Sequence, residues 1–101
     1  MAVGQREIPG AGIIRLAYAA RQMTLAGHPR IAVDPAISGG RPIVVGTRVR
    51  VSDVLEMLAA GAGESEIVAD FPYLTREDIR ACLAYAAASA DHPIVISDAA
   101  E

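Results

Sequence analysis

Residues 42–51 read Pro-Ile-Val-Val-Gly-Thr-Arg-Val-Arg-Val, a composition typical of two short strands around a turn. β-Branched residues dominate both arms. Gly46-Thr47 lies between the arms, and glycine at the first central position favours a type II′ turn of two residues. We therefore predict a β-hairpin in which Gly46 and Thr47 have a structural role. The pairs expected to lie opposite each other are Val45 with Arg48, Val44 with Val49, and Ile43 with Arg50.

Two arginines of the second arm, Arg48 and Arg50, fall on one face of the predicted hairpin because side chains alternate along a strand. Two neighbouring guanidinium groups attract anions, so both residues are candidates for DNA contact. In the alternative interpretation their aliphatic stems pack on the sheet and no ligand is involved.

The chain before the hairpin predicts one helix, one strand and one loop. Apolar residues recur at helical spacing over residues 13–26, and Gly27 ends this helix. Residues 31–33 are expected to form a short strand. Gly39 and Gly40 predict a loop with positive φ angles, so they are the other two residues to which we assign a structural turn.

After the hairpin the chain is expected to form three helices. Ser52 is the candidate N-cap of the first helix. Thr75 is the N-cap of the third, and Asp78 follows it by three residues, which is close to a capping box. The expected ranges are about residues 53–60, 64–70 and 76–89.

The short turns between these helices fit a helix-turn-helix unit. Arg76 and Arg80 would lie on one face near the start of the recognition helix, where their repulsion costs roughly 0.2–0.5 kcal/mol. A phosphate or base edge would relieve that repulsion, which makes both residues candidates for DNA contact. The alternative is that Glu77 pairs with Arg80, and the acids Glu77 and Asp78 argue against nearby phosphates.

Composition excludes several function classes. The 101 residues suffice for one small domain. A single cysteine, Cys82, cannot form an intramolecular disulfide and argues against a cysteine-based zinc site. The chain has no lysine, which excludes a P-loop, and no apolar run reaches the ~18 residues of a membrane helix. We expect no catalytic residue, no metal site and no cofactor.

Charge is unevenly distributed along the chain. Residues 1–50 contain seven arginines and two acidic residues, whereas residues 51–101 contain two arginines and ten acidic residues. The first part could attract nucleic acid and the second a basic protein, although a mixed surface without a specific partner is the alternative. In the second part, an apolar triplet precedes an acidic tail and either closes the protein's own sheet or pairs with a partner's sheet. These candidate partner-binding residues are Ile94, Val95 and Ile96.

Three motifs are specific in combination: Gly-Gly-Arg-Pro at residues 39–42, Gly-Thr-Arg at 46–48, and Asp-x-Pro-x-Leu-Thr at 70–75. With them, residues 30–87 resemble the bacterial domain-of-unknown-function family 433. The matching residues are Arg30-Ile31, Asp34-Pro35, Ser38-Gly39-Gly40-Arg41-Pro42, Gly46-Thr47-Arg48-Val49, Gly61, Glu66-Ile67, Asp70, Pro72, Leu74-Thr75, Glu77-Asp78-Ile79 and Ala81 to Ala86.

The resemblance implies a homeodomain-like domain with a β element before it. The expected fold class is therefore mainly α with a small β element, in which a short β-hairpin precedes a three-helix homeodomain-like helix-turn-helix core and an extra helix lies N-terminal to both. The expected divisions are an N-terminal extension with one helix at residues 1–29, the family-433-like domain at 30–90, and a C-terminal strand and acidic tail at 91–101.

Members of that family look like VapB-type antitoxins. The resemblance implies that the protein neutralises a PIN-like ribonuclease toxin and binds its own operator DNA, and it implies no catalytic residue. We expect a cytoplasmic homodimer with no membrane partner. The alternative is a protein-interaction module that does not bind DNA, and salt-dependent binding to its own promoter fragment distinguishes the two.

Overall fold

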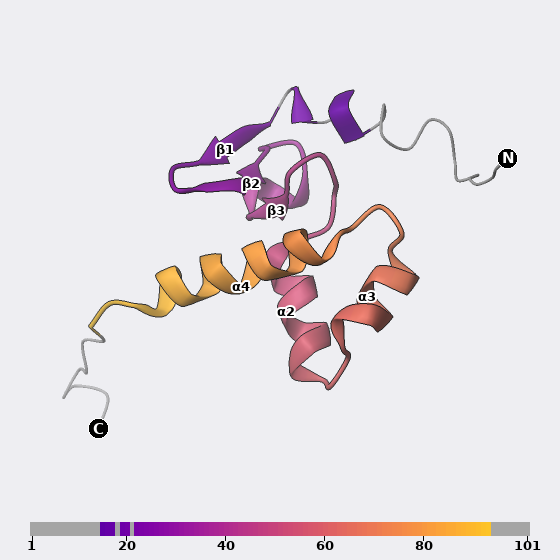
Figure 1. Ribbon diagram of the computed structural model, residues 1–101. Helices are drawn as coiled ribbons and strands as arrows, with labels where there is room; N and C mark the ends of the chain where they lie inside the picture. The colour runs from indigo at the N-terminus through magenta and orange to yellow at the C-terminus, as the bar shows by residue number, and fades with distance from the viewer. Residues whose placement is uncertain (1–14, 18, 21, 94–101) are drawn as a thin grey trace, which may run out of the picture.

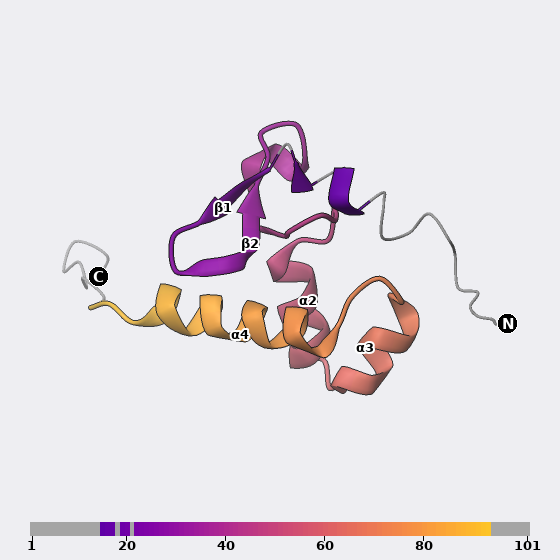
Figure 2. The same ribbon diagram turned by 45° about the horizontal axis from the view of Figure 1, so that its top comes forward.

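The computed structural model describes residues 15–17, 19, 20 and 22–93. Within them, a small sheet lies on one side of helix α4, and helices α2 and α3 lie on the other side (Figures 1 and 2). The fold is mixed α/β, and its β element is a three-stranded antiparallel sheet. The elements in order are β1 (Met23–Leu25), β2 (His28–Val33), the 3-10 helix η1 (Ser38–Gly40), β3 (Ile43–Val44), α2 (Val51–Ala59), α3 (Glu64–Asp70) and α4 (Arg76–Ala90).

The helix expected over residues 13–26 is wrong at its C-terminal end. Residues 15–17 and 19 are helical, but residues 23–25 form strand β1, which pairs with β2 and turns back at Gly27 with φ 81°. Met23, Thr24 and Leu25 gain backbone hydrogen bonds from the open edge of β2, which a three-residue helical end could not match. The short strand expected at residues 31–33 is confirmed as the C-terminal half of β2.

The turn after β3 keeps the expected register but has a different geometry. Ile43 forms an antiparallel bridge with Arg50, and the Val49 carbonyl accepts a hydrogen bond from the Val44 N–H at 2.9 Å. The turn is closed one residue earlier than a type II′ hairpin requires, because the Thr47 N–H donates to the Val44 carbonyl at 3.0 Å. Val45 and Arg48 therefore belong to a four-residue loop and do not pair.

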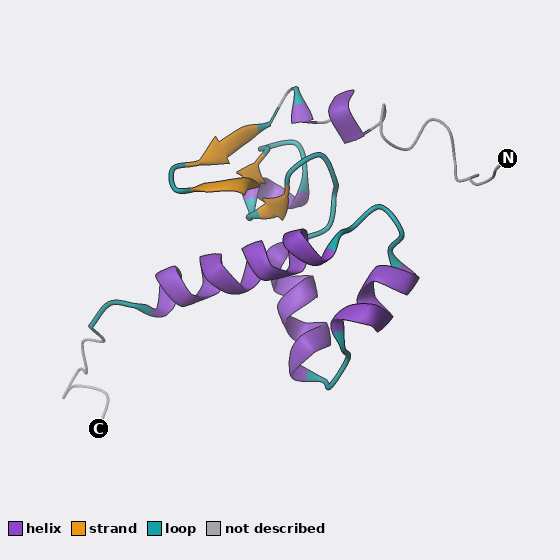
Figure 3. Ribbon diagram, in the orientation of Figure 1, coloured by secondary structure: helices purple, strands orange, loops and turns teal. Residues whose placement is uncertain are grey.

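The three helices after this turn lie close to their expected positions (Figure 3). Helix α3 matches its expected range, and α4 ends one residue after Ser89. Helix α2 begins at Val51, with Arg50 instead of Ser52 as its N-cap, because the Val51 side chain is buried in the core. None of the helices in the described part of the chain is long and apolar enough to cross a membrane.

One core joins the sheet to the helices, and α4 lies against both. Strand residues Ile31 and Val44 pack with Val54, Ile67 and Ile79 from the three helices. Their strand neighbours Ala32 and Ile43 point to the opposite face of the sheet, as alternation requires, and form a second cluster with Ile37. Both faces of the β2–β3 pair are therefore buried, so the sheet is an integral part of the domain.

Candidate functional site

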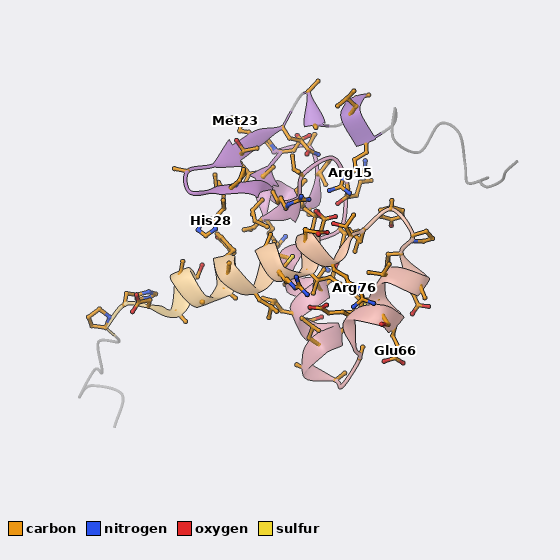
Figure 4. All side chains as sticks on the ribbon, viewed as in Figure 1. Arg15, Met23, His28, Glu66 and Arg76 are labelled. Atoms are coloured by element: carbon orange, nitrogen blue, oxygen red, sulfur yellow. The ribbon has the colours of Figure 1, made fainter. Side chains whose placement is uncertain are left out.

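Arg76 and Arg80 lie together on the exposed side of α4, next to α3. Glu64 at the start of α3 pairs with both: its carboxylate is 3.3 Å from Arg76 Nη1 and 3.6 Å from Arg80 Nε. Arg76 also donates to the Ser65 hydroxyl at 2.8 Å, and Figure 4 shows its side chain between α4 and α3. The structure thus relieves the expected repulsion through Glu64, and both arginine side chains stay more than half exposed.

The other two candidate DNA contacts, Arg48 and Arg50, have separate surroundings. Arg50 donates to both carboxylate oxygens of Asp53 in the first turn of α2, at 3.3 and 3.2 Å. Arg48 is exposed and lines a shallow hollow together with Phe71 and Tyr73. The turn therefore ties one arginine to an acid and leaves the other beside aromatic side chains.

A buried carboxylate, Asp78, accepts four hydrogen bonds from three residues. Its side chain is 1% exposed. Arg15 approaches it with two nitrogens, at 3.1 and 3.0 Å, and Arg30 donates to it at 3.1 Å. The Thr75 N–H also donates to it at 2.9 Å, and the Asp78 N–H returns a bond to the Thr75 hydroxyl at 3.1 Å, which completes the expected capping box.

These contacts set the ionisation of Asp78 and of the neighbouring thiol. Burial raises the pKa of Asp78, but hydrogen bonds from Arg15, Thr75 and Arg30, with the charge of Arg15, outweigh burial and hold that pKa below its ordinary 3.8. Asp78 is therefore a carboxylate at neutral pH. Burial, followed by the charge of Asp78, raises the pKa of Cys82 to about 11, so this cysteine is a protonated thiol and not a nucleophile.

Arg15 reaches from the N-terminal segment across the turn to α4. Its Nε donates to the Val45 carbonyl at 3.0 Å, and its Nη1 donates to the Tyr73 carbonyl at 2.6 Å. It also packs on Gly46, where an added Cβ would collide with the Arg15 side chain and carbonyl oxygen. Gly46 has φ 78°, so two separate constraints favour glycine at this position.

Sequence reasoning missed this cluster for a physical reason. The sequence predicts that Asp78 takes part in a helix cap, which the structure confirms, but the capping motif contains no sign of two distant arginines. Arg15 and Arg30 are 63 and 48 residues away along the chain. The available signal was the charge distribution. Residues 1–50 contain more arginines than acidic residues, which indicates that some of these arginines pair with acidic residues of the part 51–101.

Three further points concern the candidate sites. Ile94, Val95 and Ile96 lie outside the described residues. Within residues 15–17, 19, 20 and 22–93, no three histidine, cysteine, aspartate or glutamate side chains gather in a metal-binding group. The other turn glycines, Gly39 and Gly40, have positive φ angles of 65° and 81°.

Three comparisons relate the chain to known proteins. A family model described as "Protein of unknown function (DUF433)" matches residues 25–86. The "Uncharacterized protein y4eO" of Sinorhizobium fredii is 41% identical over 64 residues, which are 63% of this chain and 29% of that protein. The chain thus matches less than a third of that relative's length.

The third comparison is with a solved structure. The crystal structure of a DUF433 member protein from Anabaena variabilis has a TM-score of 0.54 and 25% sequence identity to this chain. The match covers 79% of this chain and 74% of that one. The family model includes Arg30, Gly46 and Asp78 but begins after Arg15.

Proposed function

The chain belongs to the DUF433 family, as its motifs predicted, and on that premise we propose that it is a non-enzymatic, cytoplasmic antitoxin-like protein. In this proposal a homodimer binds operator DNA through a homeodomain-like unit of α3 and α4. The same protein neutralises a PIN-like ribonuclease through a protein surface. The conclusion rests on one observation, the pair of exposed arginines at the start of α4.

Arg76 and Arg80 suit a DNA contact by their position and chemistry. In a helix-turn-helix unit the N-terminal residues of the second helix contact base edges in the major groove. The planar guanidinium fork fits phosphate and guanine acceptors. Glu64 holds both side chains beside each other, and an exposed ion pair contributes only about 0–1 kcal/mol. Exchange of Glu64 for a DNA acceptor therefore costs little.

Charge reversal tests this assignment. The double variant R76E/R80E is expected to lose binding to the protein's own promoter fragment. If some binding remains measurable, the slope of log K against log salt is expected to flatten by about two units. The matched control is R48E/R50E, which changes the net charge equally. If the control loses binding and R76E/R80E does not, the DNA surface lies at the turn. If neither variant changes binding, the helix-turn-helix proposal is wrong.

The second candidate function is a protein-interaction module without DNA binding. The excess of acid in residues 51–101 favours it, since acidic side chains on α2 and α3 repel phosphate. The wild-type protein separates the two candidates: promoter binding no stronger than binding to unrelated DNA supports the interaction module. Identification of the product of the adjacent gene, and co-purification of the two proteins if that product is a PIN-like ribonuclease, tests the antitoxin role in either case.

A further inference from the structure

We propose that the face formed by α2, α3 and the loop at residues 71–75 is a docking groove for a basic, apolar segment of a partner protein. This inference gives a place and a chemistry to the protein-binding half of the proposed function and rests on that half. It is independent of DNA binding, because the groove contains neither Arg76 nor Arg80.

The groove consists of two shallow hollows that share part of their lining. One hollow lies between α2 and the loop before α4, where Phe71 and Tyr73 line its floor. The other lies between α2 and α3, above the buried Ile67. Met57 and Ala60 near the end of α2 line both, so the hollows adjoin at the end of that helix.

The floor of the groove offers apolar surface to a ligand. Tyr73 is 45% exposed, which is high for a large aromatic side chain, and its ring meets Phe71 edge to face at 6.2 Å. Met57 is half-buried and packs against the core on one side and lines the groove on the other. Aromatic and methionine side chains of this kind are enriched where proteins bind one another.

The rim of the groove is acidic. Asp53 and Glu56 border the first hollow, and Glu66 and Asp70 border the second. Figure 4 shows Glu66 pointing away from the helices. Asp53 pairs with Arg50 and Glu66 accepts from the Gly63 N–H, whereas Glu56 and Asp70 are both exposed.

This charge pattern selects the occupant. Among the described residues that line the two hollows, Arg48 is the one basic side chain against four acids. Nucleic acid and anionic lipid are repelled by such a rim, whereas lysine or arginine beside an apolar anchor is attracted. A short amphipathic segment with leucine or phenylalanine on one face and basic residues on its edges matches both the floor and the rim.

A synthetic peptide pair tests the proposal on the full chain. One fluorescent peptide carries leucine at i, i+3, i+4 and i+7 with flanking lysine and arginine, and the second carries glutamate in place of the basic residues. We expect the basic peptide to bind at least about tenfold more tightly in fluorescence anisotropy, because every rim acid contributes attraction to one and repulsion to the other. Equal binding of both peptides, or binding of neither, overturns the proposal.

Two variants place the binding on the groove. Ala60→Arg inserts a long cation where the hollows join and is expected to weaken binding by about tenfold or more. Glu56→Lys changes one rim charge and is expected to weaken it about threefold. The matched controls are Ala87→Arg and Glu77→Lys on the exposed side of α4, which should stay within about twofold. Loss in the controls, or no loss in Ala60→Arg, places the peptide elsewhere and overturns the proposal.

A second copy of the chain is the competing occupant. If the wild-type protein is an oligomer in sedimentation equilibrium and Ala60→Arg dissociates it, the groove is a self-interface and the proposal is wrong. If the oligomeric state is unchanged in Ala60→Arg while peptide binding is lost, the groove receives a different protein. Promoter binding by Ala60→Arg, measured in parallel, reports on α4 alone, so failure of the groove and failure of DNA binding are distinguishable.

Discussion

Asp78 shows how much a single side chain connects in this domain. Its carboxylate caps α4, meets Arg30 on β2 and binds Arg15 from the N-terminal segment. Two arginines on one carboxylate leave a positive surplus, and the partial exposure of Arg15 and Arg30 lets solvent stabilise it. The buried charge is therefore tolerated because all its hydrogen-bonding capacity is used.

We predict that Asp78→Asn lowers the free energy of unfolding by about 3 kcal/mol, since it leaves two partly buried cations without a counter-charge. Urea unfolding followed by circular dichroism measures the loss. Glu77→Gln is the matched control because Glu77 is the exposed neighbour on the same helix turn, and its effect should stay within about 0.5 kcal/mol. A loss in Asp78→Asn no larger than that of the control would show that the cluster does not stabilise the fold.

The lowered pKa of Asp78 also predicts a pH dependence. A carboxyl group with a lower pKa in the folded state stabilises the fold above its unfolded value of 3.8, and this contribution is lost as pH falls through the folded value. The stability difference between wild type and Asp78→Asn should therefore be constant near neutral pH and shrink at pH values below 3.8. Urea titrations of both proteins at several acidic pH values measure it. A difference that stays unchanged in strong acid would contradict the assignment.

At the scale of elements, the turn at residues 44–49 shows what the sequence can specify. The β-branched arms and Gly46 predicted two segments in register, and the bridge between Ile43 and Arg50 agrees. The β-branched arms and Gly46 did not specify the turn geometry, because that geometry depends on the side chain of Thr47. Thr47 is buried, and its hydroxyl donates to the Val44 carbonyl at 2.8 Å and accepts from the Val49 N–H. The Thr47 side chain thus reinforces the backbone bond from the Thr47 N–H to the Val44 carbonyl and holds the loop in a geometry other than the expected type II′ turn.

We predict that Gly46→Ala costs about 2 kcal/mol of unfolding free energy, from strain at positive φ and from the collision with Arg15. Gly61→Ala is the control, since Gly61 has φ 103° but no atom within 4 Å of an added Cβ. It should show the strain alone, about 1 kcal/mol. Thermal unfolding of both variants measures the difference, and equal losses would mean that the Arg15 contact accommodates a methyl group.

Helices and strands differed in how well local sequence specified them. Helices α3 and α4 were predicted closely because Pro72 after α3 and the Thr75 cap before α4 mark their ends locally. Strand β1 was not predicted, because residues 23–25 carry no strand signal of their own and become a strand by pairing with β2. Sequence periodicity over three residues cannot distinguish a helix end from a strand.

At the scale of the whole molecule, the two candidate surfaces are built from different side chains and both involve α3. The arginine pair lies on α4 next to α3, and the acidic groove lies across the end of α2. Sequence motifs pointed to the family and to the arginine pair, since both are local. They could not reveal the groove or the Asp78 cluster, because each gathers residues from several elements that only the tertiary fold brings together.

The N-terminal segment provides the last test of this organisation. Arg15 bonds to the turn, to the loop before α4 and to Asp78, and Gln22 accepts from the Gly46 N–H at 2.6 Å. Both residues precede the part of the chain that matches the family model. The contacts of Arg15 are charged or charge-assisted, and Gln22 adds neutral hydrogen bonds to the turn, so removal of both residues should be costly.

We predict that a chain starting at Met23 loses about 2–3 kcal/mol of unfolding free energy, because Asp78 then keeps Arg30 as its one cation among the described residues. Urea unfolding of the truncated chain and of the double variant Arg15→Ala/Gln22→Ala should give the same loss. If the truncated chain is as stable as wild type, the contacts of Arg15 contribute nothing to the fold. If it loses much more than the double variant, residues 1–22 stabilise the domain through contacts other than those of Arg15 and Gln22.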